Sequence, residues 1–516
     1  MSIESVPVMP ERKGLILAVV CIATYAVLVE GSIVNIALPS IVRQLNADTT
    51  ELKWIVDAYN LVFAALVLVG GSLSDKFGRR RFLALGLVIF GIGNAIAALA
   101  NDTGLLITSR GVMGLGAALV FPTTLSIITN TFTERGERAK AIGLWGAMTG
   151  LGVASGPIIG GWLLESFYWG SVFVVMVPAA MIGVVATLMF IPESRDPESP
   201  PIDWGGVALS TVALAALVAA IIQGPSWGWL DGKTLSGFGI AVVFAVLFIG
   251  WERKQDEPML DVLLFKNARF SAASGSITAA FFALFGFIFL VTQYFQFVRG
   301  YGTLSSGLRT LPVAISIATA AITGTRLAVK YGNRTVVATG LTLMSIAFFW
   351  IAFFMDRNYP YELIVLNMIV MGLGIGFTTA PATESIMGAV SKEKAGQGSG
   401  VNDATREVGG TLGVAVIGSV YASMYASQLD SSSAWQSVPS ELLSQAEDGV
   451  GIALGVTEGA RETLGNDVVV QLQSDVIEAF IRGLSIGCVV AGVVTLIGAA
   501  AAARFLPARP QVPQAT

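Results

Sequence analysis

Long runs of apolar residues, separated by short polar or glycine-containing connections, recur along this 516-residue chain. A helix needs about 20 apolar residues to cross a lipid bilayer. On that rule the pattern predicts fourteen spanning helices, and an even number places both chain ends on one side of the membrane. The predicted ranges are 14–38, 52–73, 82–100, 104–129, 138–164, 168–191, 204–223, 234–251, 270–297, 306–329, 335–355, 361–387, 400–425 and 479–505.

A hydrophilic break near the middle of the chain, residues 192–203, follows the sixth predicted helix. The next two helices are short and almost free of internal charge. Without them the chain has two groups of six spanning helices, which is the number expected for a pseudo-symmetric carrier with two halves. We therefore expect an all-α integral membrane protein in which two extra helices join two six-helix bundles. The predicted parts are a terminus over 1–13, a bundle over 14–191, linkers with the extra helices over 192–269, a bundle over 270–505 and a tail over 506–516.

One segment within the last part, residues 427–478, is acidic and too polar to span a membrane. Its stretches 441–446 and 467–477 are expected to form short helices. Two interpretations of the whole segment remain open, a solvated loop or a lid over an outer opening.

The composition excludes several classes of protein. Hydrophobic residues make up 54% of the chain and charged residues only 13%, about half of the charged share in soluble domains. A net charge of −4 without a basic domain argues against nucleic-acid binding. Both cysteines, Cys21 and Cys488, lie in apolar runs, so we expect neither a disulfide framework nor a metal site. No ATP-binding loop and no catalytic constellation is present, so we expect no cofactor and no enzyme activity.

The distribution of lysine and arginine sets the expected orientation. Most of the 31 basic residues fall in the connections on one side of the predicted helices, and such connections face the cytoplasm. We therefore expect a multi-pass protein of the cell membrane with both termini cytoplasmic and with 427–478 outside.

The strongest local motif follows the second predicted helix. Gly71 allows helices to approach, Gly78 permits a tight turn, and Asp75 lies among cations that begin at Arg79. A topology anchor alone explains the arginines but not Asp75, so we assign these four residues to a conformational switch. A degraded copy over 327–334 keeps the Leu, Lys, aromatic, Gly and Arg spacing, which indicates an internal repeat.

A second glycine pattern lies in the fifth predicted helix. Gly152, Gly156 and Gly160 are four residues apart and therefore share one helix face, and Pro157 adds a kink. Ordinary small-residue packing does not require the proline. We therefore expect a moving contact here and add these residues to the switch.

These motifs resemble a known family. Residues 71–81 resemble motif A of the major facilitator superfamily, 106–116 resemble its motif B, and 143–161 match its motif C, the antiporter signature. Several further segments resemble the fourteen-helix drug:proton antiporter branch, the EmrB/QacA type. The chain departs from that branch at Glu30, where Asp is usual, and at Gly170, where Arg is usual. The further segments are 30–39, 54–59, 203–206, 294–301 and 402–410.

Three ionisable residues from three predicted helices share one depth in the N-terminal half. Glu30, Asp57 and Arg110 lie roughly 8–12 Å below the outer surface at 1.5 Å per residue. Because Arg110 cannot neutralise two acids, at least one acid is expected to function beyond a structural ion pair. The chain has no histidine, so proton transfer near neutral pH is left to carboxylates. We assign proton coupling to Glu30 with Arg110, and recognition of cationic substrates to Asp57 together with Glu30.

A second charged set lies near the inner face. Glu384 ends the twelfth predicted helix, whereas Asp403, Arg406 and Glu407 begin the thirteenth. An inner gate made of ion pairs and a role in binding substrate or protons are equally open, and Glu407 is kept in both sets. Aromatic residues near Tyr294 either face lipid and core or line a cavity for flat cations, and Tyr294 joins the substrate set.

The resemblance implies a major facilitator fold and export of amphipathic, cationic drugs or antiseptics against proton influx, which leads to antibiotic resistance. We expect a monomer whose partners are such small molecules, protons and the lipid bilayer. A dedicated exporter of one metabolite, antibiotic or lipid on the same scaffold is the alternative, because fold analogy cannot decide between them.

Overall fold

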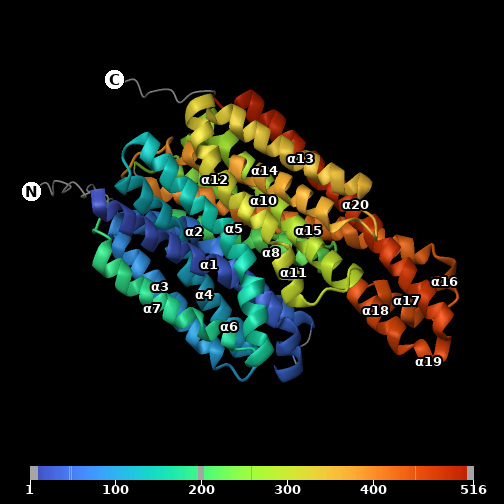
Figure 1. The fold of residues 1–516 in the computed structure, drawn as a ribbon. Helices are drawn as coiled ribbons and strands as arrows, with labels where there is room; N and C mark the ends of the chain where they lie inside the picture. Colours follow the sequence, from blue (N-terminus) through green and yellow to red (C-terminus); the bar gives the residue numbers. More distant parts are fainter. Residues whose placement is uncertain are drawn as a thin grey trace, which may run out of the picture.

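The long helices of this protein pack side by side in one bundle, as Figure 1 shows. The computed structural model describes residues 10–45, 47, 49–195, 203–256, 258–447 and 449–507. Predictions for residues 1–9, 196–202 and 508–516 therefore lie outside the described residues. Within the described part, fourteen helices are long and apolar enough to cross a membrane, which confirms the number expected from the hydropathy pattern.

The N-terminal half contains six spans, and the last of them is preceded by one short helical turn. Asp102 begins α4 by accepting a hydrogen bond from Leu105 N at 2.8 Å, which satisfies a free amide at the helix start. The helices are α1 (Pro10–Leu45), α2 (Thr49–Phe77), α3 (Arg79–Ala98), α4 (Thr103–Thr131), α5 (Arg135–Ser166), α6 (Ser171–Val174) and α7 (Met176–Phe190).

The C-terminal half also contains six spans. Two of them are interrupted by a change of helix type or direction near the end of the bundle that contains the α3–α4 and α13–α14 connections, which we call the outer end. Asn267 caps its first span by accepting a hydrogen bond from Arg269 N at 2.9 Å. The helices are the 3-10 helix η1 (Val262–Lys266), α10 (Ala268–Gln293), the π-helical turn η2 (Tyr294–Val298), α11 (Thr303–Arg309), α12 (Leu311–Tyr331), α13 (Asn333–Phe354), α14 (Tyr361–Met387), α15 (Ala395–Asp430) and α20 (Asn466–Phe505).

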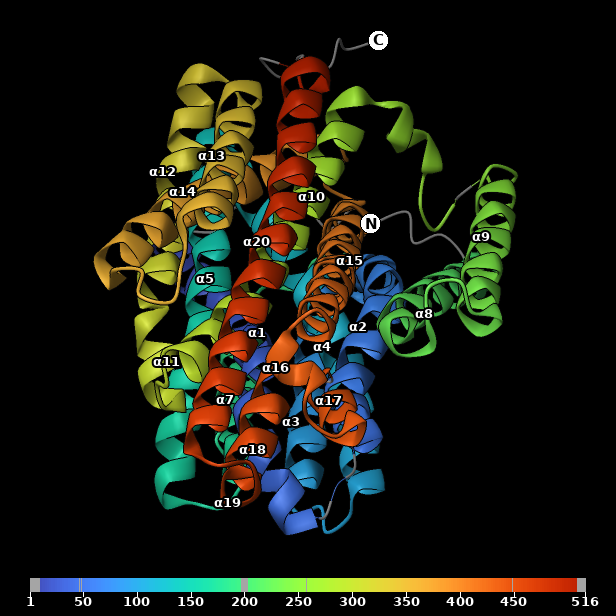
Figure 2. The same ribbon diagram turned by 90° about the vertical axis from the view of Figure 1, so that its right-hand side faces the viewer.

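The two extra spans, α8 (Trp204–Trp227) and α9 (Gly232–Glu252), form a hairpin outside both halves, on the right of Figure 2. Helix α8 packs against α2 of one half and α15 of the other. Lys53 donates a hydrogen bond to Ser226 at 2.7 Å, and the indole of Trp229 donates one to Ser419 at 3.0 Å. The hairpin therefore covers the seam between the halves.

The acidic segment 427–478 is largely helical rather than an irregular loop. Its small helices are α16 (Ser433–Gln436), α17 (Ser440–Glu447), α18 (Val450–Gly459) and α19 (Arg461–Leu464), and they gather at the outer ends of α15 and α20 (Figure 2). The expected helix at 441–446 is present within α17. The expected short helix at 467–477 is instead the first part of the 40-residue α20, because no breaking residue separates it from the apolar span.

The halves meet along two helix pairs, α2 with α15 and α5 with α12. We call the end of the bundle that contains the connections α2–α3, α4–α5 and α14–α15 the basic face. Backbones touch there because glycine leaves no side chain between them: a Cβ on Gly71 would clash with the carbonyl oxygen of Gly396, and one on Gly143 would lie 3.0 Å from that of Ala321.

The glycine face of α5 that the sequence predicts packs within one half, against α1. A Cβ on Gly152 would lie 2.6 Å from Leu28 Cβ, and one on Gly156 would lie 2.9 Å from the backbone nitrogen of Ile33 and would also clash with the hydroxyl of Ser32. Pro157 points elsewhere, and Gly307 of α11 lies against it. The helix therefore presents two faces to two neighbours.

Replacing Gly156 with valine should push α1 away from α5, because no space exists for a side chain at this point. Overpacking of a tight interior site costs about 1–3 kcal/mol. We expect a lower Tm for Gly156→Val than for the original protein in detergent. Gly239→Val is the matched control, because no heavy atom lies within 4 Å of a Cβ built there. Equal Tm values for both variants would contradict the close contact.

Candidate functional site

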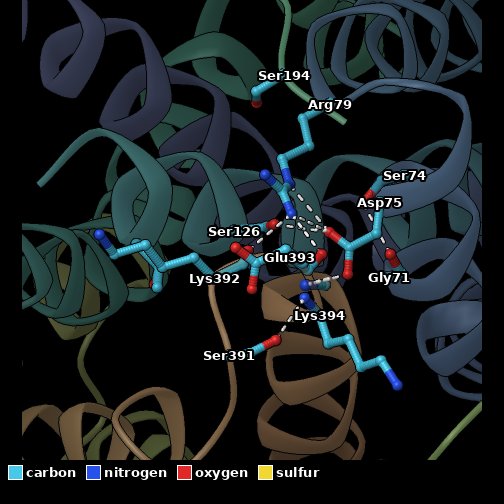
Figure 3. A network of polar contacts seen from close by, with 12 residues as sticks. Gly71, Ser74, Asp75, Arg79, Ser126, Ser194, Ser391, Lys392, Glu393 and Lys394 are labelled. Atoms are coloured by element: carbon cyan, nitrogen blue, oxygen red, sulfur yellow. Dashed lines mark hydrogen bonds and ion pairs between the residues drawn. The ribbon is translucent and has the colours of Figure 1, made fainter. Parts of the chain in front are cut away.

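The basic face is held shut by the motif after α2, shown in Figure 3. Asp75 Oδ1 accepts hydrogen bonds from Arg79 Nε at 2.9 Å and Nη2 at 2.7 Å, and from Ser126 at 3.2 Å. The same Arg79 Nη2 donates to the carbonyl oxygens of Lys392 and Glu393 at 3.0 and 2.9 Å, in the connection before α15. One buried ion pair therefore links α2 and α3 to the other half.

The second carboxylate oxygen of Asp75 caps α15 across the interface. Gly396 N, in the first turn of α15, donates to Asp75 Oδ2 at 2.6 Å, whereas Lys394 at the N-cap position supplies no side-chain cap. A negative charge beside a helix N-terminus is stabilising because free amides and the helix dipole both favour it. Gly71 and Gly396 bring the backbones close enough for this contact.

The turn after Asp75 depends on glycine for a conformational reason. Gly78 has φ 109°, in the region that favours glycine, and directly precedes α3. Gly332, in the degraded copy of the motif, has φ 90° and precedes α13 in the same way. The internal repeat indicated by the sequence therefore recurs as the same backbone turn.

A second set of ion pairs closes the basic face from the opposite half. The carboxylate of Glu384, at the end of α14, lies 3.5 Å from Arg135, 4.0 Å from Arg138 and 3.6 Å from Arg269. Arg135 and Arg138 belong to the first turn of α5, so two of these pairs cross the interface. Asn333 donates to Glu384 at 2.8 Å from the position that follows Gly332, as Arg79 follows Gly78. The N-terminal half thus contacts the first turn of α15 through Asp75, and the C-terminal half contacts the first turn of α5 through Glu384.

The remaining members of the predicted inner gate are arranged differently. Arg406 donates one hydrogen bond, to Thr383 at 3.3 Å, and its Nε and Nη1 have no hydrogen-bond partner in the described part of the chain. Asp403 accepts from Asn402 at 2.8 Å, and its second oxygen likewise has none there. Glu407 is half-buried on the same helix. Arg406 contacts the residue directly before Glu384, but within the described ranges none of these three side chains forms an ion pair with the Glu384 cluster.

In the N-terminal half, α1 and α4 are joined by an ion pair with no exposed atoms. Arg110 Nη1 lies 2.7 Å from Glu30 Oε1, and both side chains are fully buried. Arg110 Nε also donates to the carbonyl oxygen of Ile55 at 2.7 Å, and its guanidinium lies 4.6 Å from the centre of the Tyr59 ring. The arginine therefore has partners on α2 that do not depend on the charge of Glu30.

Asp57 and Tyr294 lie apart from this pair. Asp57 is half-buried on α2 and forms no ion pair within the described ranges, so of the two acids only Glu30 pairs with Arg110 there. Tyr294 is buried at the outer end of α10, where its hydroxyl donates to the carbonyl oxygen of Asp356 at 3.1 Å.

A small cavity that opens to solvent lies between the halves on the outer side of these contacts. Its lining is apolar apart from hydroxyl groups and one amide, and contains no charged side chain. The lining comes from α1, α5, α10, η2, α11 and α12 and includes Ile36, Thr149, Pro157, Phe287, Phe295, Gln296 and Ile317. None of the predicted substrate residues lines it, whereas Pro157 of the predicted switch does.

Sequence patterns missed several residues of this site. Gly396 makes a backbone contact between the halves, but nothing in the sequence distinguishes it from most other glycines, and Gly143 was recognised only as the start of the segment that matches motif C. Arg135 and Arg138 served only as orientation signals. The acid at the end of α14 predicted ion pairs of Glu384 in general, but the sequence did not identify their partners.

Comparison with known proteins identifies the fold family. The sequence profile of the Major Facilitator Superfamily matches residues 20–414. The chain belongs to that superfamily. It is 32% identical to the multidrug efflux pump LfrA of Mycolicibacterium smegmatis over 95% of this chain and 96% of LfrA. It is 34% identical to the multidrug resistance protein Stp of Mycobacterium tuberculosis over 79% of this chain and 75% of Stp.

Solved structures agree on the fold. The human organic anion transporter MFSD10 (TETRAN) superposes with a TM-score of 0.59 at 16% identity, over 94% of this chain and 99% of that one. The proton:xylose symporter XylE superposes with a TM-score of 0.62 at 13% identity, over 96% of both chains. The chain is therefore a multi-pass membrane protein with the major facilitator fold and two additional spans.

Removing the charge of Asp75 should loosen the basic face. Asp75→Asn turns one acceptor oxygen into an amide that cannot accept from both Arg79 and Gly396. Hydrogen bonds to charged groups contribute roughly 1.5–3 kcal/mol, so we expect the ratio of closed to open molecules to fall about tenfold or more. Spin labels at Glu134 and Ser391, exposed on the two halves, report the change as longer distances in pulsed EPR.

The matched control is Asp102→Asn. Asp102 also caps a helix, but the helix is in its own half and at the opposite face. Asparagine is an equally good N-cap, so the distance distribution should stay unchanged. An unchanged distribution for Asp75→Asn as well would exclude Asp75 as the residue that holds the halves together.

Proposed function

We propose that this protein exports amphipathic, cationic drugs or antiseptics across the cell membrane in exchange for protons. The multidrug efflux and resistance proteins that it resembles support drug export. The excess of basic residues on one face supports a cytoplasmic location for that face and for both termini. The apolar lining of the cavity supports amphipathic substrates, because the hydrophobic effect is not directional and such a lining can bind the apolar parts of differently shaped molecules.

The observation that carries proton coupling is the fully buried pair of Glu30 and Arg110. Charged groups inside the hydrocarbon layer are costly unless they are paired. A carboxylate here has two low-energy states, an ion pair with Arg110 or a neutral acid that carries a proton. Because Ile55 and Tyr59 hold the guanidinium in either state, Glu30 is able to gain and lose a proton without releasing Arg110.

Alternating access follows from the contacts at the basic face. The Asp75–Arg79 and Glu384 clusters hold that face closed while the cavity lies on its outer side. We assign both clusters to the inner gate and to the switch, together with Gly71, Gly78 and the glycine face of α5. Opening them would expose the cavity to the cytoplasm, where substrate binds. The protein acts as a monomer in this scheme, because both gate clusters are formed by residues of the two halves of one chain.

The proposed function is tested by transport in proteoliposomes. Ethidium loaded on the side of the basic face should leave when a proton gradient is imposed, and an uncoupler should stop its export. A panel of neutral and cationic amphiphiles then distinguishes broad export from a dedicated substrate. Ethidium and panel movement that is equal with and without protein would exclude the function.

Substituting the two membrane acids should separate proton coupling from substrate recognition. Glu30→Gln mimics the protonated acid, so we expect substrate binding to remain and proton release on substrate addition to disappear. Asp57→Asn should weaken the binding of cationic substrates more than that of neutral ones, whereas proton release should remain. The measurement is the pH change of a weakly buffered detergent solution on addition of ethidium.

Each acid is the control for the other, because both substitutions exchange a carboxylate for an amide at similar depth. Proton release from Glu30→Gln but not from Asp57→Asn would reverse the assignment. Release from both would move the coupling site to Glu384 or Glu407.

A further inference from the structure

The guanidinium of Arg406 lies among three aromatic rings and forms no ion pair within the described ranges, although Asp403 and Glu407 of the same helix lie close enough to act on it electrostatically. Its carbon lies 4.6 Å from the centre of the Trp145 ring, 5.0 Å from that of Phe281 and 6.0 Å from that of Phe121. Arg406 is 4% exposed and has a single hydrogen bond. The electron-rich faces of the rings stabilise a desolvated cation in this position, in addition to the charges of the two acids.

The cage formed by Trp145, Phe281 and Phe121 is assembled from both halves. Trp145 on α5 and Phe121 on α4 belong to the N-terminal half, whereas Phe281 on α10 and Arg406 on α15 belong to the C-terminal half. The indole of Trp145 is fixed because its nitrogen donates to Thr124 at 3.0 Å. Movement of the halves relative to one another therefore changes the distance between the cation and two of its three rings.

The cage lies directly beneath the floor of the cavity. Thr149, four residues after Trp145, and Leu284, three residues after Phe281, both line the cavity. One helical turn rises about 5.4 Å, so the rings of Trp145 and Phe281 lie about one turn nearer the basic face than these two lining residues. A flat cation in the cavity and the guanidinium of Arg406 are thus candidates for the same rings.

We propose that this aromatic cage is the receptor for the cationic group of an exported compound, and that Arg406 is an internal cation that occupies it when the basic face is closed. The proposal rests on the proposed function and adds its substrate site. When the basic face opens, the C-terminal half withdraws Arg406, and the cage accepts the cation of the substrate. On closure Arg406 returns and displaces that cation toward the outer cavity.

Equilibrium binding of ethidium, a planar cation, to the purified full-length protein in detergent tests this displacement. Arg406→Gln removes the internal competitor, so we expect ethidium to bind about tenfold more tightly than to the original protein, as a cation–π contact of this size implies. Arg406→Lys keeps a cation and should retain the original affinity. Arg309→Gln is the matched control, since Arg309 lies 4.0 Å from the centre of the Tyr301 ring, outside the cage.

A double-variant cycle separates displacement from a general charge effect. If the tighter binding depends on the cage, adding Trp145→Leu to Arg406→Gln should abolish it. Phe281→Leu is the second cage variant, for use if the tryptophan variant does not fold. Tightening that persists in both cage variants, or that appears equally in Arg309→Gln, would overturn the proposal, as would unchanged or weaker binding by Arg406→Gln.

Transport measurements keep this test separate from that of the proposed function. Arg406→Gln should export ethidium more slowly than the original protein because release is impaired, although it binds ethidium more tightly. Failure of the original protein to export any compound of the panel would exclude the function alone. Failure of the affinity change, with export intact in the original protein, would exclude the cage alone.

Discussion

The arrangement of this protein depends on one carboxylate that serves as the cap of a helix in the other half. Asp75 and Gly396 are 321 residues apart in the chain, yet the contact at 2.6 Å satisfies the start of α15 that its own N-cap residue leaves open. Arg79 neutralises the same carboxylate and binds the backbone before α15. Because these groups are polar and buried, separating the halves leaves charge and amides unpaired unless water enters. Buried polar contacts therefore hold the basic face closed, and the cavity described above lies on the other side of them.

Helix α5 connects this interface to the buried ion pair. Gly152 and Gly156 bring its backbone against α1 on either side of Glu30, at Leu28 and Ile33. A second set of small positions, which includes Gly143 and Gly150, brings the same helix against α12 of the other half. One helix therefore packs closely against neighbours in both halves. The helix that packs on either side of Glu30 is thus the helix that contacts α12 of the other half, and it also carries Trp145.

The sequence by itself determined the elements and much of the N-terminal site. Fourteen spans followed from the length of the apolar runs, because the thickness of the bilayer leaves little choice of helix length. The repeated turn at Gly78 and Gly332 followed from local spacing, and its positive φ values show why glycine occupies both positions. The depth of Glu30 and Arg110 placed them at one level, since the rise per residue is constant, and their side chains do meet. These features depend on distances along one or two helices.

Only the tertiary structure decided which of two equally deep acids holds Arg110, and which partners the residues near the basic face choose. Glu384 meets the arginines at the start of α5. Arg406, three residues after Asp403 and one residue before Glu407, instead lies among three aromatic rings from α4, α5 and α10. The acidic segment before α20 likewise forms packed helices, although its composition is that of a loop. The physical reason is the same in each case. Contacts across the interface depend on the rotation and the register of helices that are far apart in the chain, and hydrophobic periodicity carries no information about either.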